Sequence, residues 1–248
     1  MKKRILLIKS TIAVLFFCTC FSALGQNSSQ KDTLSNYTFE ELSEKFYTAK
    51  PDSLKAVLYA KYHINKARKE KDTLQIGSGY YFLSDITRDS TYYVNYWNQI
   101  IRATRSTNNT LYPTISYFKI GDFFFHKGEK EIALNNYLRA LNSVIKTPND
   151  SLKAFILTRI GMSKYRNKEY SDAIELYKKS LIYFNKEKYT RNETNEHISL
   201  LLNLSSTHKY LKQYDSAFFY NKKAYLTAIK FDRNDIIGYL TNSSGGIL

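Results

Sequence analysis

The chain has 248 residues, of which 43% are hydrophobic and 15% aromatic, with only 9 Gly and 3 Pro. So few breakers argue against a sheet sandwich or a disordered chain, and they favour long helices. The 37 Lys and Arg against 22 Asp and Glu give a net charge of +15, which raises nucleic acids and anionic surfaces as partners to be considered.

Residues 1–25 have the pattern of a bacterial secretory signal peptide. A basic stretch ends at Lys9, an apolar stretch follows over 10–24, and the small residues Ala23 and Gly25 stand just before Gln26. We therefore predict an exported protein, periplasmic or membrane-associated, that is cleaved after residue 25. The alternative is a retained N-terminal membrane anchor, although about fifteen apolar residues fall short of the ~20 that span a bilayer.

The two cysteines, Cys18 and Cys20, both lie inside this segment. Phe17 and Thr19 before them match a lipoprotein cleavage site poorly, and the remaining chain has no thiol for disulfides or metal ligation. After cleavage the chain keeps 33 basic and 22 acidic residues, a balance of +11. The basic residues are spread along helices, which indicates a solvated surface and no nucleic acid partner, whereas an anionic membrane surface or an acidic glycan remains open.

Residues 26–37 are polar and without periodicity, which predicts a disordered leader. Two helical patterns follow, over 38–49 and from residue 51, and they predict an atypical first helix pair that caps a helical array. The next pair is expected over 73–87 and 90–105. There Tyr96 stands where a small residue would permit close packing, so we expect these helices to lie apart or to shift in register. We interpret Trp97 as a filler between repeats rather than a ligand platform.

Three later stretches repeat one layout of small side chains. A small residue in one helix is followed by an alanine twelve positions later and by another small residue nineteen positions later. The three sets are Gly121, Ala133 and Ala140; Gly161, Ala173 and Ser180; Ser205, Ala217 and Ala224. Small residues at matched depth let two helices approach closely, so the layout predicts three helix hairpins, with Asp150 or Ser151 capping the helix that runs through Ile160.

This alternation of small and large positions resembles the tetratricopeptide repeat (TPR) family, from residue 38 to the C-terminus. The resemblance implies an all-α, right-handed alpha-alpha superhelix, that is, a solenoid of about five helix pairs over 38–234, with 235–248 starting a further, incomplete repeat. The sequence departs from the family pattern at Lys164 and His208, where an aromatic residue is usual, and at Asn221, where the other repeats have Tyr.

Catalytic and metal-binding motifs are missing from the sequence. The four histidines, His63, His126, His197 and His208, are far apart and show no metal-binding spacing, and neither a phosphate-binding loop nor a nucleophile motif is present. We therefore expect a non-catalytic protein without metal or cofactor.

The resemblance further implies that the first helix of each pair lines a groove for a protein or peptide partner. The expected groove positions are Asp122, Phe125 and His126; Met162, Tyr165 and Arg166; Ser206, Lys209 and Tyr210. Aromatic and Arg residues commonly anchor peptides, but Phe125, Tyr165 and Tyr210 would equally suit packing between repeats.

The sequence thus favours an interaction scaffold outside the cytoplasm. Two alternatives stay open. One is the sensory half of a membrane-spanning signalling or transcription regulator that continues beyond Leu248, and the other is a cell-wall or glycan-binding protein, which the 22 Tyr would suit.

Overall fold

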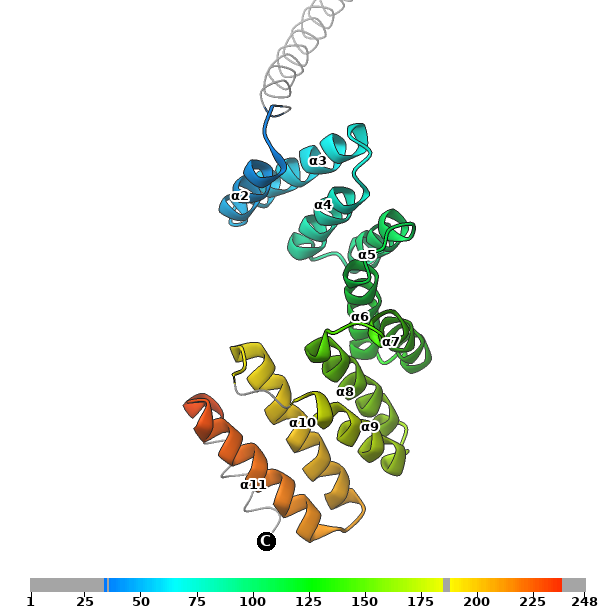
Figure 1. Cartoon of the computed structure of the whole chain (residues 1–248), viewed down its shortest axis with the longest axis vertical. Helices are drawn as coiled ribbons and strands as arrows, with labels where there is room; N and C mark the ends of the chain where they lie inside the picture. The colour runs from blue at the N-terminus through cyan, green and yellow to red at the C-terminus, as the bar shows by residue number, and fades with distance from the viewer. Residues whose placement is uncertain (1–33, 35, 185–187, 238–248) are drawn as a thin grey trace, which may run out of the picture. The chain divides into compact units, whose positions relative to one another are not determined.

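The computed structural model describes residues 34, 36–184 and 188–237 (Figure 1). The predicted signal peptide, most of the predicted leader and residues 238–248 lie outside the described residues. The regular structure in the described part is α-helical. Its helices are α2 (Phe39–Ala49), α3 (Ser53–Lys69), α4 (Thr73–Ile86), α5 (Ser90–Thr104), α6 (Leu111–His126), α7 (Lys130–Val144), α8 (Asp150–Arg166), α9 (Tyr170–Tyr183), α10 (Arg191–Tyr210) and α11 (Tyr214–Lys230). Among these described helices, not one combines the length and the apolar character needed to cross a membrane.

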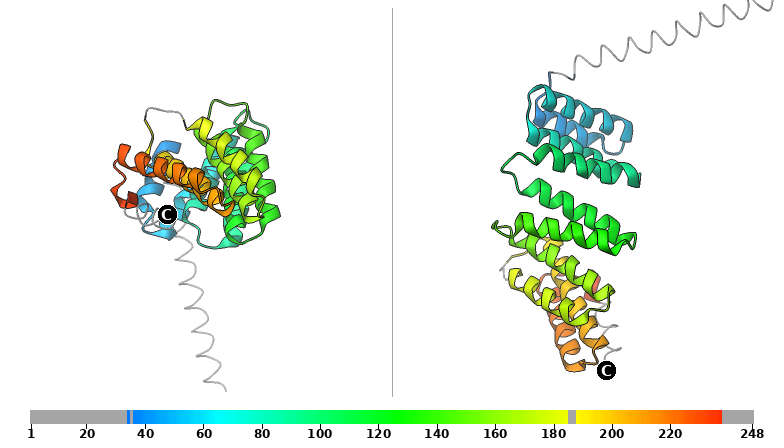
Figure 2. Two further views of the ribbon diagram at one scale, coloured as in Figure 1. Left: turned by 90° about the horizontal axis from the view of Figure 1, so that it is seen from below. Right: turned by 90° about the vertical axis from the view of Figure 1, so that its right-hand side faces the viewer.

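The chain divides into two compact units, Met1–Gln99 and Ile100–Leu248, with the boundary inside α5. In the second unit, α6 pairs with α7, α8 with α9 and α10 with α11 as antiparallel hairpins (Figures 1 and 2). Neighbouring hairpins stack because α7 packs on α8 and α9 packs on α10, while α8 also contacts α6 and α10. The predicted all-α, helical-repeat fold is confirmed.

Small residues permit the close approach within these hairpins. A Cβ atom added at Gly121 would lie 2.7 Å from the Tyr137 ring, and one added at Gly161 would lie 2.5 Å from the Tyr177 ring. Both tyrosines are fully buried. In the third hairpin the Ser205 hydroxyl donates a 2.7 Å hydrogen bond to the carbonyl oxygen of Ala217 on the partner helix. The tyrosine ring thus fills the space that the missing side chain leaves, as the repeated layout predicts.

In the first unit, α3 packs against both α2 and α4. At Gly79 of α4 an added Cβ would lie 2.5 Å from Ile64 of α3, which shows how close those helices come. Helices α4 and α5 instead meet through rings, with Tyr80 and Tyr96 centroids 6.2 Å apart. The expected second pair, 73–87 with 90–105, is therefore not a close hairpin. The small residue of α4 that permits close approach, Gly79, faces α3 instead of α5.

Trp97 of α5 is 3% exposed, and its ring lies 5.8 Å from the ring of Tyr81. It also lies 6.0 Å from the ring of Tyr93. The indole is therefore a packing residue of the first unit, as interpreted from the sequence.

One kind of turn closes each hairpin of the second unit and also joins α3 to α4. The residue after the helix C-cap takes a positive φ, and the next N–H donates to a carbonyl five residues earlier, as in Glu129 to Phe124 at 3.0 Å. This is the Schellman arrangement, which satisfies the free carbonyls of a helix end. The left-handed residues are Lys71, Gly128, Lys168, Lys212 and, after α11, Asp232.

Side chains cap several helix starts. Thr38 before α2 and Thr190 before α10 each form a capping box with the Glu three residues on. The cap of α8 is Asn149, whose side chain accepts from the Leu152 N–H at 3.1 Å. The expected caps Asp150 and Ser151 are one and two residues too late, because Asn149 is as good a cap as Asp and the helix begins earlier.

Candidate functional site

A chain of polar contacts crosses the first helices of the three stacked hairpins. Arg159 of α8 donates through Nε to Asp122 of α6 at 3.2 Å. The same guanidinium donates to both carboxylate oxygens of Glu196 on α10, at 3.2 and 3.1 Å. The Tyr137 hydroxyl of α7 donates to Asp122 at 2.7 Å. We call this set, Asp122, Tyr137, Arg159 and Glu196, the ion line.

The ion line is partly shielded from solvent. The side chains of Asp122, Arg159 and Glu196 are between 20% and 22% exposed. Burial alone would lower the pKa of Arg159, but the carboxylates of Glu196 and Asp122 more than offset it and raise that pKa. Burial, together with Asp122, also raises the pKa of Tyr137. Arg159 therefore stays charged and Tyr137 stays neutral at neutral pH, and the contacts of the ion line link the three first helices.

A second group of side chains lies at the turn end of the same helices. The rings of Tyr165 and Tyr170 lie 5.5 Å apart. The Tyr210 ring from α10 lies 5.5 Å from Tyr165 and stacks on Tyr170 at 5.4 Å. Burial and the neighbouring Tyr210 raise the pKa of Tyr165 to about 12, so its hydroxyl stays protonated. We call Tyr165, Tyr170 and Tyr210 the tyrosine cluster; Tyr210 is its most accessible member at 63% exposed.

Arg166 links the tyrosine cluster to the preceding hairpin. Its guanidinium lies 3.6 Å from the centre of the Phe125 ring and donates to the Phe125 carbonyl oxygen at 2.9 Å. Phe125 itself is buried. Lys130 Nζ lies 3.5 Å from the Arg166 carbonyl oxygen, so the turns of two neighbouring hairpins are tied together.

The positions expected to face a partner fall in different places. Asp122 and Met162 both contact Arg159, whose Nε donates to Asp122 and whose Nη1 approaches the Met162 sulfur at 3.7 Å. Tyr165 and Tyr210 belong to the tyrosine cluster. Phe125 belongs to the core, in agreement with the packing interpretation for that residue. His126, Arg166, Ser206, Lys209 and Tyr210 are exposed.

Three residues of this region were not anticipated, namely Arg159, Tyr170 and Glu196. Arg159 precedes Met162 by three positions and so lies on the same helix face, a spacing that could have identified it. Tyr170 is the first residue of α9, the second helix of its hairpin, and no periodic pattern in the sequence pointed to it. Glu196 could not have been found, because its partner Arg159 lies on another helix, 37 residues earlier in the sequence.

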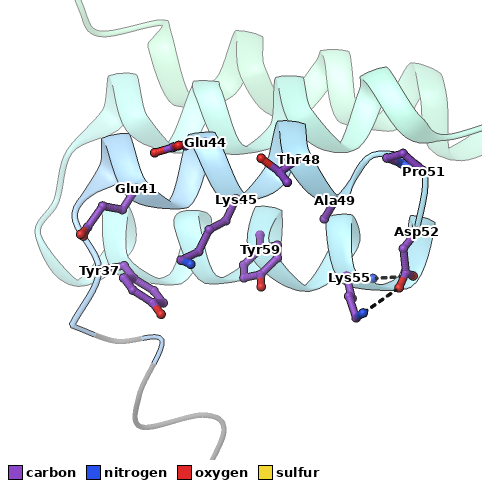
Figure 3. Close-up of a pocket in the computed structure, with 10 residues that line it drawn as sticks. All are labelled: Tyr37, Glu41, Glu44, Lys45, Thr48, Ala49, Pro51, Asp52, Lys55 and Tyr59. Atoms are coloured by element: carbon purple, nitrogen blue, oxygen red, sulfur yellow. Dashed lines mark hydrogen bonds and ion pairs between the residues drawn. The ribbon is translucent and has the colours of Figure 1, made fainter.

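Pockets are found in both units. In the second unit, a pocket of 410 Å³ lies beside the turns, lined by Gly128, Glu129, Lys130, Glu131, Ile132 and Asn167. In the first unit, a pocket of 640 Å³ runs along α2 and α3 (Figure 3).

The charges of that first-unit pocket are largely satisfied internally. Lys55 pairs with Asp52 at 3.3 Å, and Lys45 Nζ lies 4.5 Å from the centre of the Tyr37 ring (Figure 3). Its lining holds carboxylates and ammonium groups together, so it favours no single class of ligand. Among the described residues, no group of three or more His, Cys, Asp or Glu could hold a metal ion.

Comparison with known proteins identifies the fold. No family model matches the sequence, and no curated protein matches it. Solved structures do match. Aspartyl phosphate phosphatase F from Bacillus subtilis has a TM-score of 0.69 at 15% identity, over 88% of this chain and 57% of that one. The apo form of RapI has a TM-score of 0.66 at 19% identity, over 85% and 76%.

A third match names the repeat. The signal transduction ATPase (STAND) protein PH0952 from Pyrococcus horikoshii, described as having a tetratricopeptide repeat sensor, has a TM-score of 0.65 at 17% identity. The match covers 86% of this chain and 38% of that one. The chain therefore has a TPR-like fold.

Proposed function

We propose that this protein is a non-catalytic TPR-like scaffold that binds a protein or peptide partner outside the cytoplasm. The observation that carries the proposal is the tyrosine cluster beside Arg166. Three rings from two hairpins come together at one edge, and Tyr210 is 63% exposed. Tyrosine and arginine dominate the energetics of protein interfaces, because each contributes a large, stiff contact area together with hydrogen-bond donors.

The ion line supports this role indirectly. Its charges are satisfied by one another, so it adds stiffness to α6, α8 and α10 without needing a ligand. A stiff surface loses less conformational entropy when a partner binds. The partner would therefore be recognised by the exposed groups at the turn end, above all Arg166 and Tyr210.

A selection experiment tests the proposal. A displayed library of random linear peptides is selected on the full chain, and the affinity of each enriched peptide is measured by fluorescence anisotropy. Tyr210→Ala and Arg166→Ala should weaken binding by about 30-fold, the effect of losing roughly 2 kcal/mol at a hot spot. Tyr92→Ala is the matched control, because Tyr92 is 56% exposed and belongs to the first unit. The proposal fails if no peptide is enriched, or if all three variants bind the enriched peptides as the natural chain does.

The location outside the cytoplasm rests on the sequence of residues 1–25. Mass spectrometry of the protein purified from its natural host should find Gln26 as the first residue. Finding Met1 together with the protein in the membrane fraction would instead support the retained anchor. Finding Met1 in the cytoplasmic fraction would refute export altogether.

A glycan is the second candidate ligand, because Tyr210 is 63% exposed and tyrosine rings can stack on sugars. The third candidate role is the sensory half of a signalling or transcription regulator, which the TPR sensor named in the Pyrococcus horikoshii structure supports. Strong signals on a glycan array that disappear in Tyr210→Ala, without any enriched peptide, would favour the glycan. The reading frame after Leu248 tests the regulator, since a kinase or DNA-binding region encoded there would support it.

A further inference from the structure

Helix α11 is apolar on two sides. One side packs against α10 and its core through Ala217, Ala224 and Ala228, which are fully buried. The other side is accessible, and five large apolar side chains there are between 45% and 53% exposed: Tyr214, Phe218, Phe219, Leu226 and Ile229. Large exposed apolar side chains gathered on one helix commonly mark an interaction surface, so this face requires an explanation.

The repeat pattern accounts for only part of this face. The residues that match Phe218 in the earlier hairpins are Leu134 and Ile174, and both are half-buried. They are covered because each earlier second helix, α7 or α9, packs on the hairpin that follows. Phe219, however, matches the polar residues Asn135 and Glu175. The accessible face of α11 is therefore wider and more apolar than stacking of one more repeat would need.

Positive charge lies among and beside these apolar side chains, and Lys222 falls between Phe218 and Leu226 at four-residue spacing. Lys222, Lys223 and Lys230 lie on α11, whereas Asp215 is its single carboxylate. Lys223 Nζ lies 5.3 Å from the centre of the exposed Phe219 ring. An apolar face that carries more basic than acidic residues is complementary to an amphipathic helix whose apolar stripe has acidic neighbours.

We propose that the accessible face of α11 docks an amphipathic, acidic helix of another protein, independently of the tyrosine cluster. A second copy of this chain is a poorer occupant, because two α11 helices would bring their lysines together. Residues 238–248, GYLTNSSGGIL, are a poorer occupant too, because they contain no Asp or Glu. Charge complementarity therefore selects the acidic partner over both.

The test uses two synthetic helical peptides with the full chain. Both carry Leu at helical spacing on one side; the first has Glu on the flanks and the second has Lys. We expect the acidic peptide to bind at least tenfold more tightly than the basic one, as measured by fluorescence anisotropy. The double variant F219S/L226S should weaken the acidic peptide at least tenfold, and K222E/K223E should reverse the preference between the peptides.

Matched controls separate docking from general stickiness. The double variant L138S/I182S removes two exposed apolar residues from α7 and α9, and it should leave the affinity unchanged. Equal loss in this control, or equal binding of the acidic and basic peptides, would overturn the proposal. A concentration-dependent dimer in sedimentation that F219S/L226S abolishes would assign the face to a second copy. A tenfold gain in peptide affinity in Y239S/L240S would assign it to the chain's own residues 238–248.

Discussion

His63 should make the stability of the first unit depend on pH. The side chain lies in α3 and is 1% exposed, with its ring 4.9 Å from the Phe39 ring and 5.1 Å from the Phe82 ring. Within the described part of the chain, neither ring nitrogen has a hydrogen-bond partner. Burial lowers the pKa of His63 to about 4; the backbone of Gln75 and two nearby carboxylates act in the opposite direction but more weakly.

The direction and size of the effect follow from that pKa. The unfolded chain takes up the proton near pH 6.5, whereas the folded chain resists it until about pH 4. Stability is therefore unaffected above pH 6.5 and falls by up to about 1.4 kcal/mol for each pH unit between those values. Between pH 7 and pH 5 the loss amounts to roughly 2 kcal/mol, and it is complete, at about 3 kcal/mol, below pH 4.

Urea unfolding of the full chain at pH 7, 6 and 5 measures this loss. Fluorescence of Trp97, the only tryptophan in the chain and a residue of the first unit, reports on the unit that contains His63. His63→Leu removes the titrating group and keeps an apolar side chain, so its free energy of unfolding should fall about 2 kcal/mol less than that of the natural chain between pH 7 and pH 5.

Carboxylates also take up protons in this range, but they do so equally in every variant and cancel in the comparison. His126→Leu is the matched control, because His126 is exposed, and it should keep the full pH dependence. If His63→Leu and the natural chain lose the same stability on acidification, the buried, neutral imidazole is not what makes the first unit acid-sensitive.

Three further substitutions test the packing of the second unit, each by urea unfolding at pH 7. Gly161→Ala should lower the free energy of unfolding by about 2 kcal/mol, because the new Cβ would lie 2.5 Å from the Tyr177 ring; an unchanged value would mean that α8 and α9 can move apart without loss of stability. Gly128→Ala should cost about 1 kcal/mol through its φ of 82° alone, since nothing lies within 4 Å of the added Cβ, and a larger loss would contradict that cause. Arg159→Ala should cost about 2 kcal/mol, because the carboxylates of Asp122 and Glu196 lose their shared cation while partly shielded from water; no loss would show that the ion line is merely solvated surface charge.

The hairpins of the second unit could be predicted because their close contacts depend on side-chain size. Gly121 and Gly161 leave room for Tyr137 and Tyr177, and each pair is separated by sixteen residues in the sequence. Any residue larger than Gly at those positions would meet a buried ring. A size constraint of this kind appears directly in the amino-acid sequence.

The contact between α3 and α4 could not be predicted in the same way, because a lysine marks the turn that joins them. Lys71 has a φ of 57° and forms the turn between α3 and α4. A left-handed residue is expected to be Gly or Asn, so Lys71, Lys168 and Lys212 gave no signal, and only Gly128 could be recognised. The small-residue layout located the later hairpins without help from their turns, whereas α3 and α4 lack that layout and were assigned to different pairs.

The candidate site shows why contacts between repeats are harder to predict than contacts within them. Asp122 and Arg159 are 37 residues apart, and so are Arg159 and Glu196, although the repeats step by 40 and then 44 residues. The ion line therefore does not join equivalent positions; it moves toward the start of each successive first helix. Phe125 and Arg166, or Tyr165 and Tyr210, are 41 and 45 residues apart and stay close to the turns.

Two lines of contacts thus diverge across the same three helices, and they differ in which side chains they leave accessible to a partner. The ion line uses its charges internally, so replacing its residues should change stability more than binding. The line at the turn end leaves Arg166 and Tyr210 exposed, so replacing those residues should change binding more than stability. Since both lines depend on how the hairpins stack, a partner that bridges Arg166 and Tyr210 would require the register that Arg159 maintains.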